Sequence, residues 1–212
     1  MIDIFHSRIA CNTYLFWKEK ERAILVDPGY NIGNCLIDRI HHLGVKVVAI
    51  LLTHAHYDHI DALEDVLKEF PNAVSYIYEK ESDSLDNPKY NLSSWSEWGN
   101  QKLVFRPKNL VELMDEETFE AGGYTIKCIA TPFHTWGSAC FVVDDENALF
   151  SGDTLFYSTI GRTDLASSCP REMSSSLLKL VQLEKNYVVY PGHGGKTYLD
   201  REKKYNSYLR NI

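Results

Sequence analysis

Three histidines and an aspartate lie within six residues at positions 54–59, in the order His-Ala-His-Tyr-Asp-His. In an extended chain, His54 and His56 project to the same side, because side chains alternate along a strand. Asp58 and His59 follow where an apolar spacing typical of a helix begins, so we expect them at the entry of a helix. Imidazole and carboxylate groups together suit zinc, iron or manganese. The spacing predicts a metal site in which one pair of ligands binds a first ion and the other pair can hold a second.

A polar surface loop is the alternative interpretation of these four residues. Directly before them, however, residues 45–52 are apolar except for Lys46 and rich in β-branched side chains, which is typical of a strand buried on both faces. Four ligand-type side chains that converge at the end of such a strand would be costly without an ion to neutralise Asp58 and to fix the histidine tautomers. We therefore favour a metal site over a solvated loop.

Three more candidate ligands follow other predicted strands. His134 comes after a strand predicted at 124–130, and Asp153 comes after a hairpin predicted at 138–151. His193 lies in the glycine-rich loop Pro-Gly-His-Gly-Gly, which again follows a short apolar strand. Side chains at the C-terminal ends of strands lie on one rim of a layered α/β structure, where such folds place their sites. The sequence therefore predicts that these residues meet the first cluster.

A centre with two ions would use all of these side chains. Taken alone, His134 or His193 would be interpreted as a structural residue, but beside the four-residue cluster each becomes a candidate ligand. Two metal ions about 3.5–4 Å apart, joined by one carboxylate, need roughly this set of side chains. Asp153 is the predicted bridge, because a carboxylate has one oxygen for each ion.

Apolar periodicity and turn residues predict the elements that position these side chains. Gly44 fits the C-terminal end of one helix, Pro71 closes another, and Gly122 and Gly123 join a hairpin. The predicted helices span 34–43, 58–70, 170–183 and 200–209, and the predicted strands span 11–17, 23–26, 45–52, 73–78, 118–120, 124–130, 138–143, 147–151 and 187–190. Each half of the chain is thus strands followed by helices, which indicates an α/β fold.

Two features allow more than one interpretation. Asp27, in the Asp-Pro-Gly sequence after a predicted strand, is interpreted as a turn residue, with a metal-neighbouring carboxylate as the alternative. Residues 79–101 form a polar, aromatic-rich stretch that is too long for a plain connection and too aromatic for disorder. This stretch is either a cover for the site or a surface excursion held down by its aromatic side chains.

The composition indicates an ordinary globular protein. The chain has 212 residues, 44% hydrophobic and 24% charged, so we expect one domain over residues 1–212 with a full core. The net charge of −7 argues against nucleic acid or an anionic membrane as partner and leaves a small-molecule substrate. The five scattered cysteines indicate a reducing compartment. With neither a signal peptide nor an 18-residue apolar window in the sequence, we expect a cytoplasmic protein, of open oligomeric state.

The candidate ligands resemble, in order, the five signature elements of the metallo-β-lactamase fold superfamily. The matching segments are His54-Ala55-His56-Tyr57-Asp58-His59, His134, Gly152-Asp153-Thr154 and Pro191-Gly192-His193-Gly194. The resemblance extends from about Asn12 to Leu209. It implies a four-layer αββα sandwich, with two β-sheets back to back and helices outside. By position, the first ion would be held by His54, His56 and His134 and the second by Asp58, His59 and His193, with Asp153 as the bridge.

Within that superfamily, several segments are similar to the bacterial hydroxyacylglutathione hydrolase (glyoxalase II)-like branch. They are Asn91-Leu92-Ser93, Gly152-Asp153-Thr154-Leu155-Phe156, Gly161-Arg162-Thr163-Asp164-Leu165, and Thr197, Glu202, Lys203 and Asn206 near the end. The chain departs from that branch in its length, because residues 194–212 are too few for the C-terminal helical domain that supplies cations to the glutathione carboxylates. It departs also at Phe133, Trp136 and Asp164, where the branch commonly has Gly, Pro and an aromatic residue. Arg162 matches the substrate-contacting cation of the branch, with an ion pair to Asp164 as the alternative.

The resemblance implies a dinuclear zinc hydrolase that acts on a thioester such as a hydroxyacylglutathione. Two ions would lower the pKa of a water toward neutrality and polarise the carbonyl, and the thiolate would leave with little protonation. Asp58 is the catalytic candidate, because it would orient the attacking water as well as bind metal. Antibiotic hydrolysis is disfavoured, because β-lactamases of this fold usually lack the bridging aspartate. An ester or lactone is an alternative substrate.

A persulfide dioxygenase is the second hypothesis, because those enzymes resemble this chain in the Gly-Arg-Thr-Asp segment. They use one iron held by two histidines and an aspartate, and the corresponding residues here are His56, His134 and Asp153. A third hypothesis, a metal-stabilised module without catalysis, is disfavoured because structural zinc prefers closed, cysteine-rich sites.

Overall fold

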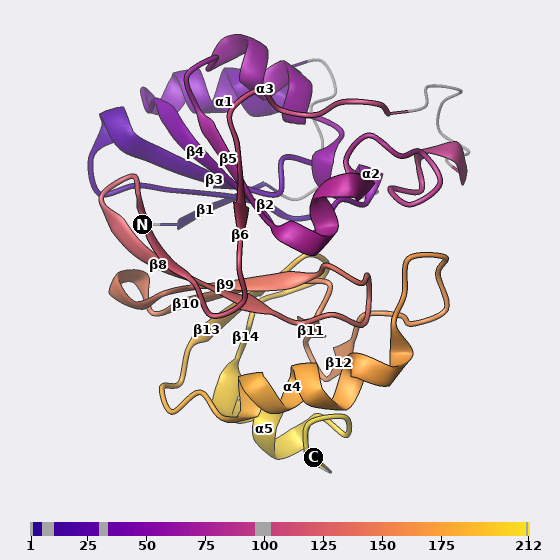
Figure 1. Cartoon of the computed structure of the whole chain (residues 1–212). Coiled ribbons are helices and arrows are strands. Elements are labelled where there is room, and N and C mark those ends of the chain that lie inside the picture. Colours follow the sequence, from indigo (N-terminus) through magenta and orange to yellow (C-terminus); the bar gives the residue numbers. More distant parts are fainter. Residues whose placement is uncertain (1, 6–10, 30–33, 96–102, 211) are drawn as a thin grey trace.

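A computed structural model describes residues 2–5, 11–29, 34–95, 103–210 and 212. Two six-stranded sheets pack face to face, and helices cover the outer face of each sheet (Figure 1). This is the four-layer αββα sandwich predicted above. In the described parts of the chain, no helix has both the length and the apolar character that crossing a membrane requires.

The first sheet carries the N-terminal half of the site. Its strands lie in chain order, with antiparallel pairing up to the third strand and parallel pairing from there on. Parallel neighbours need a crossover, and helices α1 (Cys35–Leu43) and α3 (Leu63–Glu69) supply two of them on the outer face (Figure 1). The strands are β1 (Ile2–Phe5), β2 (Thr13–Phe16), β3 (Ala23–Val26), β4 (Val47–Leu52), β5 (Val74–Tyr78) and β6 (Leu110–Leu113).

The second sheet carries the C-terminal half. Helices α4 (Met173–Val181) and α5 (Leu199–Tyr205) lie on its outer side (Figure 1). Its strands, in spatial order, are β14 (Thr197–Tyr198), β13 (Val188–Pro191), β10 (Ala148–Gly152), β9 (Ala139–Val143), β8 (Tyr124–Ala130) and β7 (Thr118–Ala121). A small hairpin joins β11 (Leu155–Phe156) to β12 (Thr159–Ile160), and short 3₁₀ turns are η1 (Lys20–Arg22), η3 (Glu79–Ser84), η4 (Ser93–Trp95), η5 (Asp144–Glu146) and η6 (Pro170–Glu172).

Aromatic side chains fill the space between the two sheets. Phe16 of the first sheet stacks on Phe150 of the second with ring centroids 5.2 Å apart, and it meets the ring of Tyr124 edge-on at 5.0 Å. All three side chains are almost fully buried. One further apolar cluster lies between each sheet and its helices, so the central strands are buried on both faces. This double burial explains why β4 reads as a continuous apolar run rather than an alternating one.

The helix predicted at 58–70 is in fact two helices. A single helical turn, α2 (Tyr57–Ile60), precedes α3, and the helical structure is interrupted between them. At the break, the backbone N–H of Ala62 donates to the carbonyl of Pro28 at 2.9 Å instead of continuing the helix. Gly29 also lies so close that a Cβ there would be 1.8 Å from the Asp58 carbonyl oxygen. A tertiary contact with the chain after β3 therefore ends the first helix, and local periodicity could not show it.

Candidate metal centre

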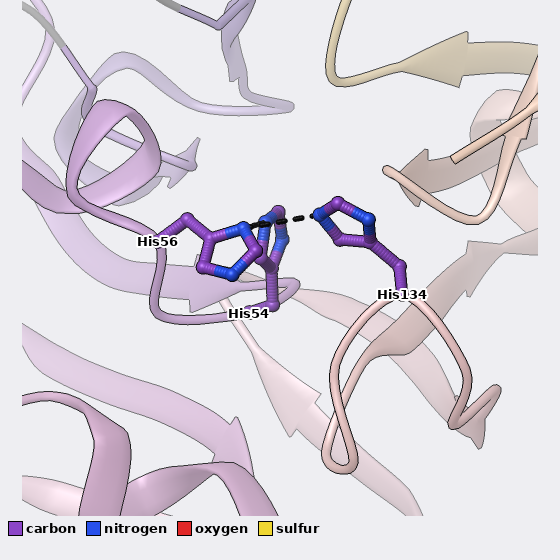
Figure 2. A group of neighbouring side chains, drawn as sticks. All are labelled: His54, His56 and His134. Carbon is purple, nitrogen blue, oxygen red and sulfur yellow. Dashed lines mark hydrogen bonds between the residues drawn. The ribbon is translucent and has the colours of Figure 1, made fainter. Parts of the chain in front are cut away.

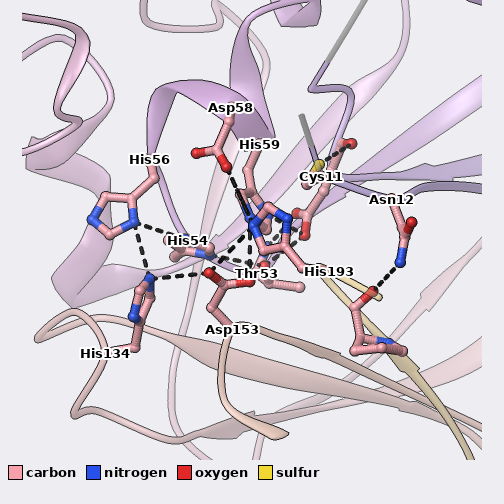
Figure 3. A network of polar contacts seen from close by, with 12 residues as sticks. Cys11, Asn12, Thr53, His54, His56, Asp58, His59, His134, Asp153 and His193 are labelled. Carbon is pink, nitrogen blue, oxygen red and sulfur yellow. Dashed lines mark hydrogen bonds and ion pairs between the residues drawn. The ribbon is translucent and has the colours of Figure 1, made fainter. Parts of the chain in front are cut away.

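The seven candidate metal ligands lie together at one edge of the sandwich, where both sheets present the ends of strands (Figure 3). The loop after β4 and helix α2 supply the ligands from the first sheet, and the loops after β8, β10 and β13 supply those from the second. The predicted convergence at a rim is therefore observed. The residues are His54, His56, Asp58, His59, His134, Asp153 and His193.

His54, His56 and His134 form the first group, and their rings point toward one another (Figure 2). Nδ1 of His56 lies 3.0 Å from Nε2 of His54 and 3.0 Å from Nε2 of His134. The three side chains are at most 3% exposed. Three imidazole nitrogens at such distances form one face of a tetrahedral zinc site, with the fourth position open.

Asp58, His59 and His193 form the second group. Nε2 of His193 lies 3.3 Å from Oδ2 of Asp58, and Nε2 of His59 lies 3.9 Å from the same oxygen. These atoms can all be ligands of one ion, because they lie within 4.8 Å of one another. His193 is the most exposed ligand of the set and lies toward the pocket described below.

Asp153 lies between the two groups. Its Oδ2 is 3.3 Å from Nε2 of His134 in the first group and 3.5 Å from Nε2 of His193 in the second, while its Oδ1 is 3.4 Å from Nε2 of His59. Gly192 makes this approach feasible, because a Cβ at that position would lie 2.3 Å from Oδ1 of Asp153. A carboxylate in this place faces both groups, as a bridging ligand must.

Asp27 orients the ring of His59. One of its oxygens accepts the Nδ1–H of His59 at 2.9 Å, and the carboxylate also accepts the backbone N–H and the hydroxyl of Thr53 at 2.8 and 2.6 Å. Because a carboxylate only accepts, Nδ1 of His59 carries a proton and Nε2 faces the cluster. The interpretation of Asp27 as a turn residue is therefore wrong for its side chain, although its backbone turns with φ 47°. Asp-Pro-Gly has the composition of a turn in either case, so the sequence favoured the commoner role.

Backbone and hydroxyl groups orient the histidines of the first group. Nδ1–H of His134 donates to the carbonyl of Arg162 at 2.9 Å, which leaves Nε2 free to face the cluster. Nε2 of His56 lies 3.2 Å from the Ser167 hydroxyl, so its Nδ1 points inward. Partners on the outer nitrogen fix the tautomer and the ring plane of a ligand histidine.

Two buried polar atoms of the cluster lack hydrogen-bond partners among the described residues, namely Nε2 of His59 and Oδ1 of Asp153. An unpaired buried acceptor is costly, and a cation between these atoms would satisfy both. Neutral nitrogen and carboxylate oxygen donors, held in two groups with a shared carboxylate, also have the chemistry of a dinuclear site for divalent ions. The residues present therefore fit such a centre.

The electrostatics of the cluster also favour a cation. Burial, together with the other histidines, lowers the pKa of His54 well below 6.5 and that of His56 to about 3. Both rings are therefore neutral and can donate an electron pair to a metal ion. Burial opposes charge on His59 as well, but the negative groups around it outweigh burial and raise its pKa well above the ordinary value. For Asp153, burial raises the pKa, and the histidines around it more than reverse that effect. The second group thus attracts positive charge.

A pocket of about 410 Å³ opens over the cluster. Part of its wall is apolar, formed by Tyr57, Leu92, Phe156 and Leu165, and Arg162 also lines it. The guanidinium of Arg162 makes a bidentate ion pair with the carboxylate of Asp164, at 2.6 and 2.8 Å, and both side chains are exposed. The ion pair foreseen as the alternative role of Arg162 is therefore present, at the edge of the pocket.

Part of the 79–101 stretch reaches this pocket. The carbonyl of Asn91 accepts the backbone N–H of Tyr57 at 2.7 Å, and the adjacent Leu92 lines the pocket wall. The ring of Tyr90 meets that of Trp136 edge-on with centroids 4.6 Å apart, so the aromatic side chains also hold the stretch in place. Residues 96–101 lie outside the described part of the chain.

Sequence reasoning missed several supporting residues. Thr53, Ser167 and Glu81 are buried and contact the ligands or the residues beside them. Thr53 directly precedes His54, and this adjacency was its only signal. Ser167 and Glu81 are far from the ligands in sequence, and nothing in the local pattern distinguishes them.

Comparison with known proteins identifies the class of protein. The model of the Metallo-beta-lactamase superfamily matches residues 7–193. A "Probable metallo-hydrolase" of Streptococcus pyogenes is 36% identical over 201 residues, which are 93% of this chain and 85% of the relative. The "Probable polyketide biosynthesis zinc-dependent hydrolase BaeB" of Bacillus velezensis is 34% identical, over 83% of this chain and 69% of BaeB. "Hydroxyacylglutathione hydrolase GloC" of Haemophilus influenzae is 27% identical, over 93% and 92%.

The chain is also similar to solved structures along nearly its whole length. The BLEG-1 B3 metallo-beta-lactamase has a TM-score of 0.87 and 32% identity, with 99% of each chain covered. TTHA1623 in a di-iron-bound form has a TM-score of 0.80 and 26% identity over 96% of this chain and 98% of that one. ETHE1 from Myxococcus xanthus has a TM-score of 0.74 over 100% of this chain and 85% of its own, and at 22% identity it shows the fold alone. The chain belongs to the metallo-beta-lactamase superfamily, and the ligand cluster together with the names of its relatives supports a metal-dependent hydrolase.

Proposed function

We propose that this protein is a dinuclear zinc hydrolase that cleaves a thioester of the hydroxyacylglutathione type. The observation that carries the proposal is the position of Asp153, whose Oδ2 lies 3.3 Å from His134 of the first group and 3.5 Å from His193 of the second. A bridging carboxylate between two histidine-rich groups is the arrangement that a two-ion hydrolase needs. The names of BaeB and GloC support zinc and this substrate class, respectively.

The residues of the centre have distinct roles in this reaction. Divalent ions held by the seven candidate ligands would supply an acidified water and would polarise the thioester carbonyl. Asp58, which lies 3.3 Å from His193 and lines the pocket, holds the proton of the attacking water and fixes its direction. The leaving thiol has a low pKa, so it departs as a thiolate without a dedicated acid.

The pocket supports a substrate with an apolar acyl portion and an anionic distal portion. Tyr57, Leu92 and Phe156 offer apolar surface beside the cluster, and Arg162 offers a guanidinium at the edge of the pocket. A substrate carboxylate would compete with Asp164 for that guanidinium, and a bidentate arginine suits such an exchange. Substrate binding by Arg162 therefore requires that its ion pair opens.

A single-iron dioxygenase that acts on a persulfide is the second candidate. Nε2 of His134 lies 3.0 Å from Nδ1 of His56 and 3.3 Å from Oδ2 of Asp153, so two histidines and a carboxylate form a compact set for one iron. Similarity to the di-iron-bound TTHA1623 is a reason to assay iron beside zinc.

Three substrates separate the candidates. Purified protein is assayed with S-lactoylglutathione and, in an oxygen electrode, with glutathione persulfide. A chromogenic cephalosporin is the third substrate, because BLEG-1 is a β-lactamase by name. We expect hydrolysis of the thioester that a chelator abolishes and zinc restores. Oxygen consumption with the persulfide and no thioester hydrolysis would replace the proposal with the second candidate, and preferred turnover of the cephalosporin would replace it with β-lactam hydrolysis.

A further inference from the structure

Glu81 is a carboxylate buried between the two loops that carry the first group of ligands. It lies in η3, directly after β5, and is 0% exposed. Its Oε1 accepts the backbone N–H of Ala55 at 3.0 Å, and Ala55 stands between the two histidines that follow β4. Its Oε2 accepts the hydroxyl of Thr135 at 2.9 Å, and Thr135 directly follows His134. One carboxylate thus joins residues that adjoin all three histidines in the chain.

The loop after His134 closes tightly around this carboxylate. The backbone N–H of Gly137 also donates to Glu81. A Cβ at Gly137 would lie 2.4 Å from the backbone nitrogen of Glu81 and 2.5 Å from its Cα, so glycine is required for this approach. Ser138 supports the same turn, because its hydroxyl lies 2.7 Å from that of Thr135 and accepts the Thr135 backbone N–H at 3.1 Å.

The described groups that contact the Glu81 carboxylate are neutral hydrogen-bond donors, and none of them is a cation. Within the described parts of the chain, its partners are two backbone N–H groups and one hydroxyl, and no charged side chain pairs with it. Burial raises the pKa of Glu81 to about 7. A buried carboxylate without a cation costs stability that an apolar or neutral side chain would not. We expect a buried carboxylate that lowers stability beside the ligands to have a role in the site, because proteins often trade stability for fixed geometry in a functional site.

We propose that Glu81 is a positioning residue for the first metal position, whose carboxylate fixes the loop of His54 and His56 against that of His134. The inference rests on the proposed metal centre. An ion then meets nitrogens that already lie 3.0 Å apart, and its binding does not have to order two separate loops. Ligands held in advance bind more tightly because less ordering is lost on binding.

Matched variants separate positioning from folding. Glu81→Gln keeps the size of the side chain but replaces one accepting oxygen with a donating NH₂, which cannot accept from the donors around it. Thr135→Val removes the hydroxyl at nearly constant volume, whereas Thr135→Ser keeps it. Glu202→Gln is the control for a buried carboxylate elsewhere. Glu202 is also 0% exposed; it accepts the Thr197 hydroxyl at 2.6 Å and the Ser158 N–H at 2.8 Å and pairs with Arg201, and none of these residues directly adjoins a candidate metal ligand.

The test measures zinc affinity by competition with a chromophoric chelator, starting from zinc-loaded protein, with the free energy of unfolding measured in parallel. We expect Glu81→Gln and Thr135→Val to weaken binding of the more tightly held zinc by about 10-fold or more, the range for residues that orient ligands. Thr135→Ser should stay within about 2-fold of wild type, and Glu202→Gln should lose stability without losing zinc affinity.

Three results decide the matter. Unchanged zinc affinity in Glu81→Gln would overturn the positioning role while leaving the metal centre intact. An equal loss in Glu202→Gln would also overturn it, because general destabilisation would then explain the effect. A wild-type protein that binds no zinc would instead refute the proposed centre itself. The spectrum of the cobalt-substituted protein gives a second readout, and a change in Glu81→Gln with none in Thr135→Ser would support altered ligand geometry.

Discussion

Replacing the carboxyl of Glu81 with an amide should change how the stability of the metal-free protein depends on pH. Burial raises the pKa of Glu81 from 4.5 to about 7 in the folded protein, whereas the unfolded chain keeps the ordinary value. Between these two values the folded state holds a proton that the unfolded state has released. This group therefore stabilises the fold at low pH, and the contribution is lost as the pH rises through about 7.

The magnitude follows from the two pKa values. They differ by 7 − 4.5 = 2.5, and each pKa unit corresponds to about 1.4 kcal/mol, so the full contribution is about 3 kcal/mol. Linkage predicts that about 2 kcal/mol of this contribution to the free energy of unfolding is gained between pH 8 and pH 5.5. This range avoids acid denaturation. Glutamine does not titrate, so Glu81→Gln removes this contribution of residue 81 to the pH dependence of stability.

Urea unfolding of wild type and Glu81→Gln, both freed of metal, checks this value at several pH values from 5.5 to 8. The free energy of unfolding of wild type minus that of the variant should rise by about 2 kcal/mol as the pH falls across this range. Other titrating groups are common to both proteins and cancel in the difference, provided that they do not couple to Glu81. A difference that stays constant within about 0.5 kcal/mol would refute the reasoning, because Glu81 would then titrate as an exposed carboxylate does.

The site allows three further predictions. Asp153→Ala should lower kcat of thioester hydrolysis by more than about 100-fold, the upper figure for loss of a residue that only orients a ligand, while circular dichroism shows a retained fold; undiminished turnover would contradict the bridging role. Asp27→Asn should weaken binding of the second zinc by about 10- to 100-fold in a metal titration, because an amide does not fix the tautomer of His59, and equal affinity would contradict this. Arg162→Ala should raise KM for S-lactoylglutathione roughly 2- to 5-fold and Asp164→Asn should lower it by a similar factor; movement of both KM values in one direction would show that the ion pair acts only structurally.

The cluster around His54 could be predicted from the sequence because four of its members lie within six residues and follow a buried strand. The more distant ligands could be predicted because each one ends a strand of an α/β layer, which fixes the rim where it must lie. His134 and His193 therefore lie where the pattern places them, although their metal-binding role stays a prediction.

The residues that support the ligands could not be predicted in the same way. Glu81 lies 26 residues from Ala55 and 54 residues from Thr135, and only the packing of the two sheets brings the three together. The break between α2 and α3 has the same origin, because Pro28 competes for a helical N–H. The edge strands β1 and β6 were also missed, since they are short and only partly buried and so lack a strong apolar pattern.

Metal content and turnover, measured on one purified sample, test the central claim most directly. Elemental analysis should find about two zinc ions per chain, and the same sample should hydrolyse S-lactoylglutathione in a reaction that chelation stops and added zinc restores. A single iron per chain, with oxygen consumed in the presence of glutathione persulfide and no thioester hydrolysis, would contradict the dinuclear hydrolase.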